Sequence, residues 1–122
     1  MTQNSFWILT VLARGRRHGY DIMREAAKLS GGSVALKATT LYAALDRLEA
    51  EGLILKDGEE IVDGRARRYY RLSDEGADAL DDEANALEMR ASIAKARLIS
   101  MRSLGAGAWL STPCVSLRVH AW

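Results

Sequence analysis

The feature of this sequence that most limits its fold is a turn signal between two strand-like segments. Asp63 and Gly64 form an Asp-Gly pair, which favours a two-residue hairpin turn because both positions tolerate positive φ. The flanking segments, residues 53–62 and 67–72, are typical of antiparallel strands. A second Asp-Gly pair at residues 57–58 is a rival turn or a bulge. We therefore expect an antiparallel hairpin in this part of the chain.

Three helical segments precede the hairpin. Residues 5–13 are apolar nearly all the way around a helix, which predicts that other elements pack against this helix on more than one side. Ser5 or Asn4 is available as its N-cap. Residues 19–29 and 37–51 each carry one apolar stripe. Three helices followed by a hairpin is the order of a winged helix, in which the third helix enters the DNA major groove. We predict an α+β, mainly helical fold: a winged helix-turn-helix with a two-stranded wing.

A long helix is predicted after the hairpin. The stretch SDEG at residues 73–76 offers a serine N-cap followed by acids in the first turn. Apolar residues then recur at alternating separations of three and four, which is a heptad seam. Such seams usually meet another helix, so we predict a dimerisation helix; the alternative is that it folds back on its own domain. The predicted interface residues are Leu80, Ala84, Leu87, Ala91, Ala94, Leu98 and Met101.

These patterns divide the chain into three parts. Residues 1–72 are the predicted winged-helix domain, residues 73–103 the dimerisation helix, and residues 104–122 a tail. Within the tail, apolar and polar residues alternate over residues 115–120, which indicates either an extra strand or an unstructured segment.

Charge is distributed unevenly, although the whole chain carries only +1. Residues 1–72 contain twelve Lys or Arg against nine Asp or Glu, whereas residues 73–101 contain three against seven. The basic part is the candidate for a polyanionic partner, but its excess is small. A nucleic-acid function must therefore depend on where the charges fall.

Several functional classes find no support in the sequence. No apolar run approaches the length of a membrane span, the two histidines lie far apart, no Cys or His cluster has metal-ligand spacing, and no glycine-rich phosphate loop occurs. We expect no enzyme activity, no cofactor and no bound metal. The N-terminal residues lack the features of a secretory signal, and Cys114 is the one cysteine, so we expect a cytoplasmic location.

Arginines gather at the end of the predicted wing. Arg65, Arg67 and Arg68 are followed by Tyr69 and Tyr70. In a winged helix these guanidinium groups project beside the third helix, where phosphates pass. This local cluster provides the positive charge for phosphate binding that the small net charge of the whole chain does not.

The third helix offers polar groups for DNA. Thr39 and Thr40 in its first turn can donate hydrogen bonds to phosphates or base edges, and Arg47 can reach a phosphate or a guanine. Free backbone N–H groups at the helix start would add to this surface. The alternative is that Thr39 is an N-cap and that Arg47 pairs with a nearby acid such as Glu51.

Three motifs in this order resemble a known family. They are HGYDI at residues 18–22, TTLYAALDRLEAEGLI at residues 39–54 and GRARRYYRLSDEGADAL at residues 64–80. Their order and spacing are similar to the winged-helix signature of the PadR family of transcriptional regulators, and the resemblance covers about residues 6–80. It implies DNA binding through the third helix and the wing, with repression as the usual outcome.

The resemblance also implies roles for single residues. It places Tyr20 and Tyr42 near the DNA backbone and marks Lys37 and Thr40 around the recognition helix. The alternative for both tyrosines is packing between helices with the hydroxyl at the surface. His18 is expected to be a structural cap.

The family is further similar in using its terminal helix for dimers and in holding small-molecule ligands at the dimer centre. On that basis Trp7, Met89 and Ile93 could line an effector pocket for an aromatic or phenolic compound. The alternative for Trp7 is an ordinary core position.

Our prediction is a sequence-specific DNA-binding regulator, a dimeric repressor relieved by a small aromatic or hydrophobic effector, with operator DNA and a second copy as partners. The alternative is a winged-helix adaptor that binds proteins, against which the wing arginines argue. The chain has Thr39, Ala43 and Ala66 where the family commonly has glycine, proline and proline. No operator sequence therefore carries over from the family.

Overall fold

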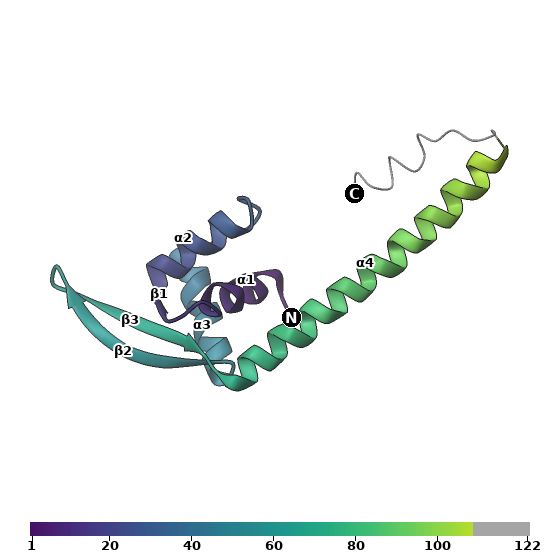
Figure 1. Ribbon diagram of the computed structural model, residues 1–122. Helices are drawn as coiled ribbons and strands as arrows, with labels where there is room; N and C mark the ends of the chain where they lie inside the picture. The colour runs from purple at the N-terminus through teal and green to yellow at the C-terminus, as the bar shows by residue number, and fades with distance from the viewer. Residues whose placement is uncertain (109–122) are drawn as a thin grey trace. The chain divides into compact units, whose positions relative to one another are not determined.

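The computed structural model describes residues 1–108 and confirms the winged-helix prediction (Figure 1). Its elements are α1 (Gln3–Leu12), β1 (Arg17–His18), α2 (Gly19–Leu29), α3 (Ala38–Ala50), β2 (Ile54–Val62), β3 (Arg65–Leu72) and α4 (Asp74–Ala108). Two compact units divide within α4, between Glu83 and Ala84. The expected strand at residues 115–120, together with Cys114, lies outside the described residues.

The wing forms as a hairpin of β2 and β3 that projects from the three helices of the first unit (Figure 1). Its turn has φ of 52° at Asp63 and 76° at Gly64, as the Asp-Gly signal predicts. The second Asp-Gly pair is a bulge and not a turn, because the register of β2 against β3 shifts between Lys56 and Glu59 and Gly58 has a φ of 94°.

The sheet contains a third strand that the sequence did not predict. β1 pairs with β3, which gives an antiparallel sheet of order β1-β3-β2, with Arg17 opposite Tyr70 and His18 opposite Tyr69. A strand of two residues is too short to show a period of two, so no alternation could reveal it. It nevertheless joins the loop after α1 to the wing.

The predicted cap of the first helix was wrong. Thr2 is the N-cap, and its hydroxyl accepts a hydrogen bond from the Ser5 amide at 3.1 Å. Ser5 lies inside the helix and is buried. The bounds predicted for the second helix agree with α2, because His18 caps its start and Gly31 and Gly32 follow its end.

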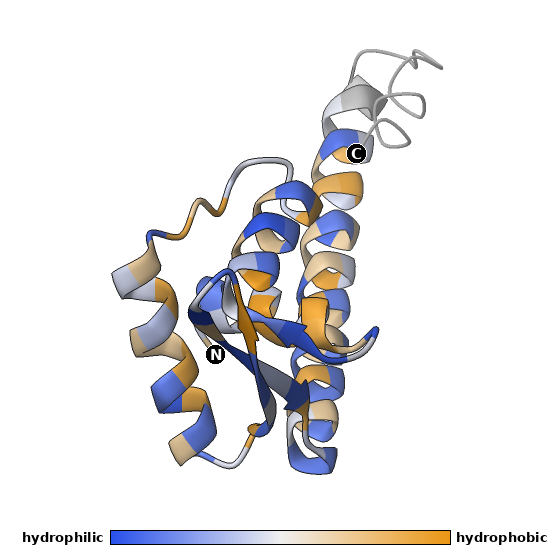
Figure 2. Cartoon of the chain, turned by 90° about the vertical axis from the view of Figure 1, so that its left-hand side faces the viewer, coloured by the Kyte–Doolittle hydropathy of each residue, from blue (hydrophilic) through white to orange (hydrophobic). Residues whose placement is uncertain are grey.

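The core of the first unit lies between α1, α2, α3 and the base of the sheet. Ile8, Leu9, Val11 and Leu12 of α1 are all buried, which agrees with a helix that is apolar nearly all the way around. Hydrophobic residues alternate with hydrophilic ones along the other helices (Figure 2). The largest fully buried side chains are Tyr70, Ile8, Leu9, Ile22, Leu41, Leu45, Leu48 and Ile54.

A joint of hydrogen bonds holds the start of α4 against the end of α3. The Ser73 hydroxyl accepts from the Gly76 amide at 2.9 Å and donates to the Gly52 carbonyl at 2.6 Å. A Cβ at Gly76 would collide with the backbone carbonyl of Leu53. Leu80, one turn further on, packs against the core of its own chain. Glycine is therefore required where α4 leaves the winged helix.

The remainder of α4, from Ala84 to Ala108, forms the described part of the second unit. It extends beyond Met101, where the heptad pattern ends. Its exposed large apolar side chains are Leu87, Met89, Ile93, Ile99, Met101 and Leu104. No helix within residues 1–108 is long and apolar enough to cross a membrane.

Candidate nucleic-acid interface

The N-terminus of α3 is open. Lys37 occupies the N-cap position, and no side chain caps the helix. Thr39 is not the N-cap, so that alternative was wrong, and Thr39 and Thr40 are both exposed in the first turn. Free N–H groups and two hydroxyls thus stand together at the positive end of the helix dipole, an arrangement suited to an anion such as phosphate.

Arg47 has a partner that the sequence did not suggest. Its guanidinium donates a hydrogen bond to the Ser5 hydroxyl of α1 at 3.2 Å, rather than pairing with Glu51. It lines a cleft of about 530 Å³ together with Met1, Thr2, Ser5, Leu48, Glu51 and Leu53. Arg47 therefore lies at the edge of α3 and is held toward α1.

Tyr20 and Tyr42 are both exposed at the surface of the two helices of the helix-turn-helix. The Tyr42 ring lies over Gly19, where a Cβ would come within 2.7 Å of the phenol oxygen. The Tyr20 ring has the Arg24 guanidinium 5.6 Å from its centre. The hydroxyl end of Tyr42 thus packs on Gly19, while both tyrosine side chains as a whole remain exposed at this surface.

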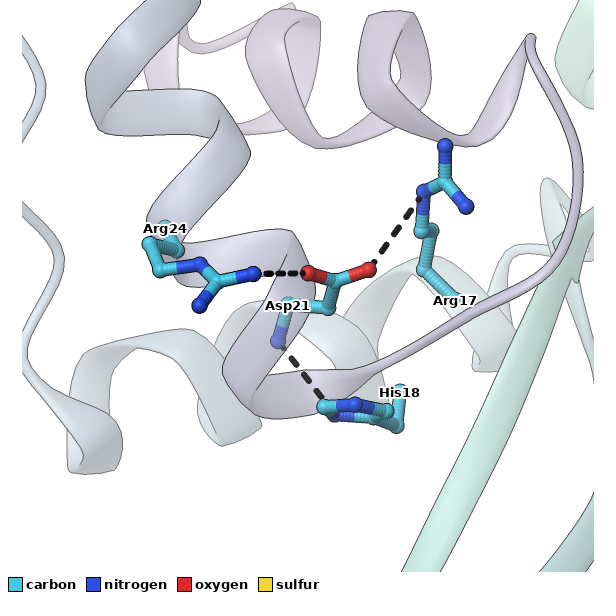
Figure 3. Close-up of polar contacts among 4 residues, drawn as sticks. All are labelled: Arg17, His18, Asp21 and Arg24. Carbon is cyan, nitrogen blue, oxygen red and sulfur yellow. Dashed lines mark hydrogen bonds and ion pairs between the residues drawn. The ribbon is translucent and has the colours of Figure 1, made fainter.

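The start of α2 is held by a small polar network (Figure 3). His18 Nδ1 accepts a hydrogen bond from the Asp21 amide at 3.3 Å, which confirms its role as a cap. The Asp21 carboxylate lies between two guanidinium groups, 3.6 Å from Arg17 Nε and 3.0 Å from Arg24 Nη2. This network orients the helix that carries Tyr20.

The three wing arginines do not share one face of the hairpin. Residues directly opposite one another in an antiparallel pair point to the same face, and faces alternate along a strand. Residues two positions apart in β3 share a face, so Arg65 and Arg67 lie on the same face as Tyr69. Arg68 lies on the other face, together with Tyr70. Because Tyr70 is buried in the core, Arg68 lies on the side of the sheet toward α3.

Charges on this inner face act on Tyr70. Burial is the main cause that raises the pKa of its phenol, while Arg68 lowers it and Glu49 and Asp46 of α3 raise it further. Lys56 of β2 also pairs with Glu49 at 3.8 Å. Charged groups of β2, β3 and α3 thus lie close together around Tyr70.

A second cluster forms on the outer face around Tyr69. The Tyr69 hydroxyl donates to the Glu60 carboxylate at 2.9 Å, and the Arg16 guanidinium lies 4.2 Å from the ring centre. The His18 ring meets the same tyrosine edge to face at 5.6 Å. The hydrogen bond to Glu60 is the main cause that raises the pKa of Tyr69.

Sequence reasoning missed Arg16 and Glu60. No sequence pattern assigned a role to either residue. In the structure Glu60 lies opposite Arg67, and Glu59 lies opposite Arg68. Strand register after the Asp-Gly turn could have revealed these pairs, since positions equidistant from a two-residue turn face one another.

The residues predicted for an effector pocket belong to different units. Trp7 is partly buried, packs against the core and meets Phe6 edge to face at 5.3 Å, in agreement with an ordinary core position. Met89 and Ile93 are exposed on α4. The described part of the chain holds no cluster of His, Cys, Asp or Glu suited to a metal ion.

Known proteins share this fold and much of this sequence. The model of the transcriptional regulator PadR-like family matches residues 8–82. A transcriptional regulator of Mycobacterium tuberculosis is 41% identical over 81 residues, which is 66% of this chain and 72% of that protein.

Two solved structures are similar over most of the described residues. A PadR family transcription regulator from Clostridium difficile has a TM-score of 0.65 and 28% identity, covering 80% of this chain and 99% of that chain. Bacillus subtilis PadR in complex with operator DNA has a TM-score of 0.61 and 28% identity, covering 69% of this chain but 46% of that chain. The fold and the sequence therefore point to one family.

Proposed function

This chain belongs to the PadR-like family of transcriptional regulators, and from that premise we propose that it represses transcription as a dimer bound to a specific DNA site. It is a transcription regulator and not an enzyme. The DNA-bound structure of the Bacillus subtilis relative supports DNA as the partner of this chain as well. The protein-binding adaptor remains the competing function.

The observation that carries the proposal is the pairing of two surfaces in the first unit. The uncapped start of α3 presents Thr39 and Thr40, while the wing presents Arg68 on the side that faces α3. A recognition helix in the major groove needs phosphate contacts beside it to fix its register. In this proposal Arg68 supplies such a phosphate contact beside the recognition helix.

The proposed contacts fall into two groups. Thr39 and Thr40 read base edges or bind phosphate at the start of α3, with Lys37 beside them. Arg65, Arg67 and Arg68 neutralise phosphates along the wing, and Tyr20 and Tyr42 donate their hydroxyls to the DNA backbone. Arg47 is the weakest member of the set, because it must leave Ser5 to reach DNA.

The exposed apolar residues of α4 support a dimer. Leu87 and Met101 of the predicted seam are exposed within this chain, and Leu98 is partly buried. A second helix across them would remove this surface from water. A dimer would also bring a second half-site into contact at high effective concentration. Solution mass tests this directly, and a monomer at micromolar concentration would count against it.

The proposal further includes relief of repression when a small aromatic or hydrophobic compound binds the protein. Trp7 reports on such a compound through its fluorescence, compared with a Trp7→Phe control because the chain has three tryptophans. A ligand that favours a dimer of unsuitable spacing would lower operator affinity by population shift. Compounds that change neither Trp7 fluorescence nor operator affinity would remove the effector from the proposal.

The decisive experiment is fluorescence anisotropy with duplex DNA from upstream of the protein's own gene. Random duplex serves as competitor, and two salt concentrations are compared. We expect binding that survives the competitor and weakens with salt, because base readout and phosphate contacts both contribute. Equal affinity for random DNA, also in a wider search over genomic fragments, would contradict a sequence-specific regulator.

A further inference from the structure

Arg16 links the loop after α1 to the wing by two contacts. Its Nη1 donates a hydrogen bond to the backbone carbonyl of Asp57 at 2.9 Å, and its guanidinium lies 4.2 Å from the centre of the Tyr69 ring. One side chain thus touches both strands of the hairpin. The hydrogen bond spans 41 positions in the sequence, so it is a tertiary contact and not a local one.

The acceptor of this hydrogen bond lies in the bulge of β2. The register shift between Lys56 and Glu59 leaves the Asp57 carbonyl outside the regular ladder, free to accept from a side chain. Gly58 has a φ of 94°, and a Cβ there would lie 3.5 Å from Arg16 Nη1, so the bulge and the guanidinium are closely packed. The bulge therefore has a partner that holds its geometry.

We propose that Arg16 is a positioning residue for the wing: by binding the Asp57 carbonyl and stacking on Tyr69, it sets the direction in which the hairpin leaves the helical domain. The proposal deepens the proposed DNA-binding function and rests on it. Arg65 and Arg67 lie beyond the bulge, on the same face as Tyr69. A change of angle at the bulge would move both guanidinium groups relative to α3.

The exposed β2–β3 hairpin needs a tertiary contact to fix its direction. Beyond the bulge, Arg65, Ala66, Arg67 and Arg68 are all exposed, and so are Glu59, Glu60 and Ile61 opposite them. A two-stranded ribbon without a packed face is only marginally stable and varies in its twist. Arg16, His18 and Tyr69 are the side chains that meet at its base on the outer face.

The first test needs no DNA. Hydrogen exchange of the wing amides is compared between the wild type, Arg16→Ala and the control Arg14→Ala. Arg14 lies in the same loop, is exposed, and makes no side-chain hydrogen bond or ion pair within the described residues. We expect exchange at residues 57–67 to quicken about threefold to tenfold in Arg16→Ala, as loss of a cation–π contact and a hydrogen bond implies. Unchanged exchange would overturn the proposal, whatever the DNA results.

Aromatic variants identify the contact responsible. Tyr69→Phe keeps the ring under Arg16 and loses only the hydrogen bond to Glu60, so it should quicken wing exchange less than Arg16→Ala does. Tyr69→Leu removes the ring and should behave like Arg16→Ala. In a double variant of Arg16→Ala with Tyr69→Leu, the two effects should not add, because they break the same contact.

The second test separates positioning from direct phosphate binding. Arg16→Lys keeps the charge but loses the planar stacking group. We expect operator affinity to fall roughly tenfold in Arg16→Ala and measurably in Arg16→Lys, with the salt dependence of binding unchanged in Arg16→Lys. Wild-type affinity in Arg16→Lys, with a salt slope lowered by about one in Arg16→Ala, would make Arg16 a phosphate contact instead. If the wild type itself lacks specific binding, the proposed function fails while the exchange result still decides the role of Arg16.

Discussion

The recognition helix and the wing offer DNA two different kinds of surface. Thr39, Ala43 and Asp46 lie on the exposed stripe of α3, and the single arginine of that helix, Arg47, is bound to Ser5. β3 carries four arginines among its eight residues. Helices that read bases need shape and directed hydrogen bonds, whereas phosphate binding needs positive charge. The proposed function therefore divides these two tasks between two elements.

Carboxylates on β2 partly balance the positive charge of the wing arginines. Arg67 lies opposite Glu60 and Arg68 opposite Glu59, so each arginine has a carboxylate on the same face. Opposite charges at such positions stabilise the hairpin modestly. They also weaken its attraction for phosphate, which limits binding to DNA of any sequence.

Removal of the wing arginines should have the largest effect. In the variant Arg65→Ala, Arg67→Ala, Arg68→Ala, we expect affinity for operator and random DNA to fall alike, by on the order of 100-fold or more at moderate salt, since three phosphate contacts are lost. The slope of log affinity against log salt should decrease by about three. Anisotropy titrations at several salt concentrations measure both quantities.

The fold and the oligomer must persist for that result to be interpretable. Circular dichroism and solution mass of the triple variant should match the wild type, because all three side chains are exposed. Unchanged affinity in a folded variant would mean that the wing does not bind DNA, and that the division between α3 and wing is wrong.

Thr39→Ala tests the other surface. We expect operator affinity to fall about fivefold to tenfold while affinity for random DNA and the salt slope stay the same, since one base contact carries roughly 1–3 kcal/mol of discrimination. Thr39 does not cap α3, so the helix should not lose stability through this change. Ala50→Ser, at the far end of the same helix, is the matched control. An equal loss for both DNAs would assign Thr39 to the phosphate backbone.

Glu59→Gln should strengthen DNA binding by the wing, whereas the preceding variants weaken DNA binding. Loss of the carboxylate opposite Arg68 should raise affinity for random DNA about twofold to fourfold and reduce the preference for operator, because an exposed charge interaction contributes under about 1 kcal/mol. Asp78→Asn, an equal change of charge on the exposed surface of α4, provides the control. If both variants bind random DNA equally well, net charge and not the wing accounts for the gain.

The smallest expected effect concerns Tyr69. Its pKa is raised above the ordinary value of about 10, chiefly by the hydrogen bond to Glu60, so Glu60→Gln should lower it toward that value. Since the folded pKa is the higher one, the stabilising contribution of this phenol is present below pH about 10 and is lost as pH rises through the folded pKa. Carbon-13 NMR of labelled tyrosine rings follows the titration, with Tyr69→Phe to assign the signal. An unchanged pKa in Glu60→Gln would mean that this hydrogen bond does not form in solution.

Elements with local signals could be predicted from the sequence. The bounds of α2 were correct because His18 caps its first turn and two glycines follow it, all within the segment itself. The Asp63-Gly64 turn was correct for the same reason. The heptad pattern likewise marked α4, but its end was placed too early, because Gly105 and Gly107 are poor helix formers and favour an earlier end than Ala108.

Contacts between distant segments could not be predicted. β1 forms because the fold brings Arg17 and His18 beside β3, where their backbones pair. Position 76 requires glycine because a Cβ there would collide with the backbone carbonyl of Leu53. The capping motif at the start of α4 was visible in the sequence, whereas the reason for its glycine was not. The hydrogen bond between Arg47 and Ser5 likewise joins residues 42 positions apart, so no local pattern could predict it.

The sequence by itself determined the order of helices and strands, the turn of the wing and the family, because periodicity, turn residues and motif spacing act over short stretches of chain. Only the tertiary structure decided which face each arginine occupies, what holds Arg47 and how Arg16 reaches the bulge. Strand register and packing bring together residues far apart in the chain, and those encounters depend on the whole fold rather than on any local pattern.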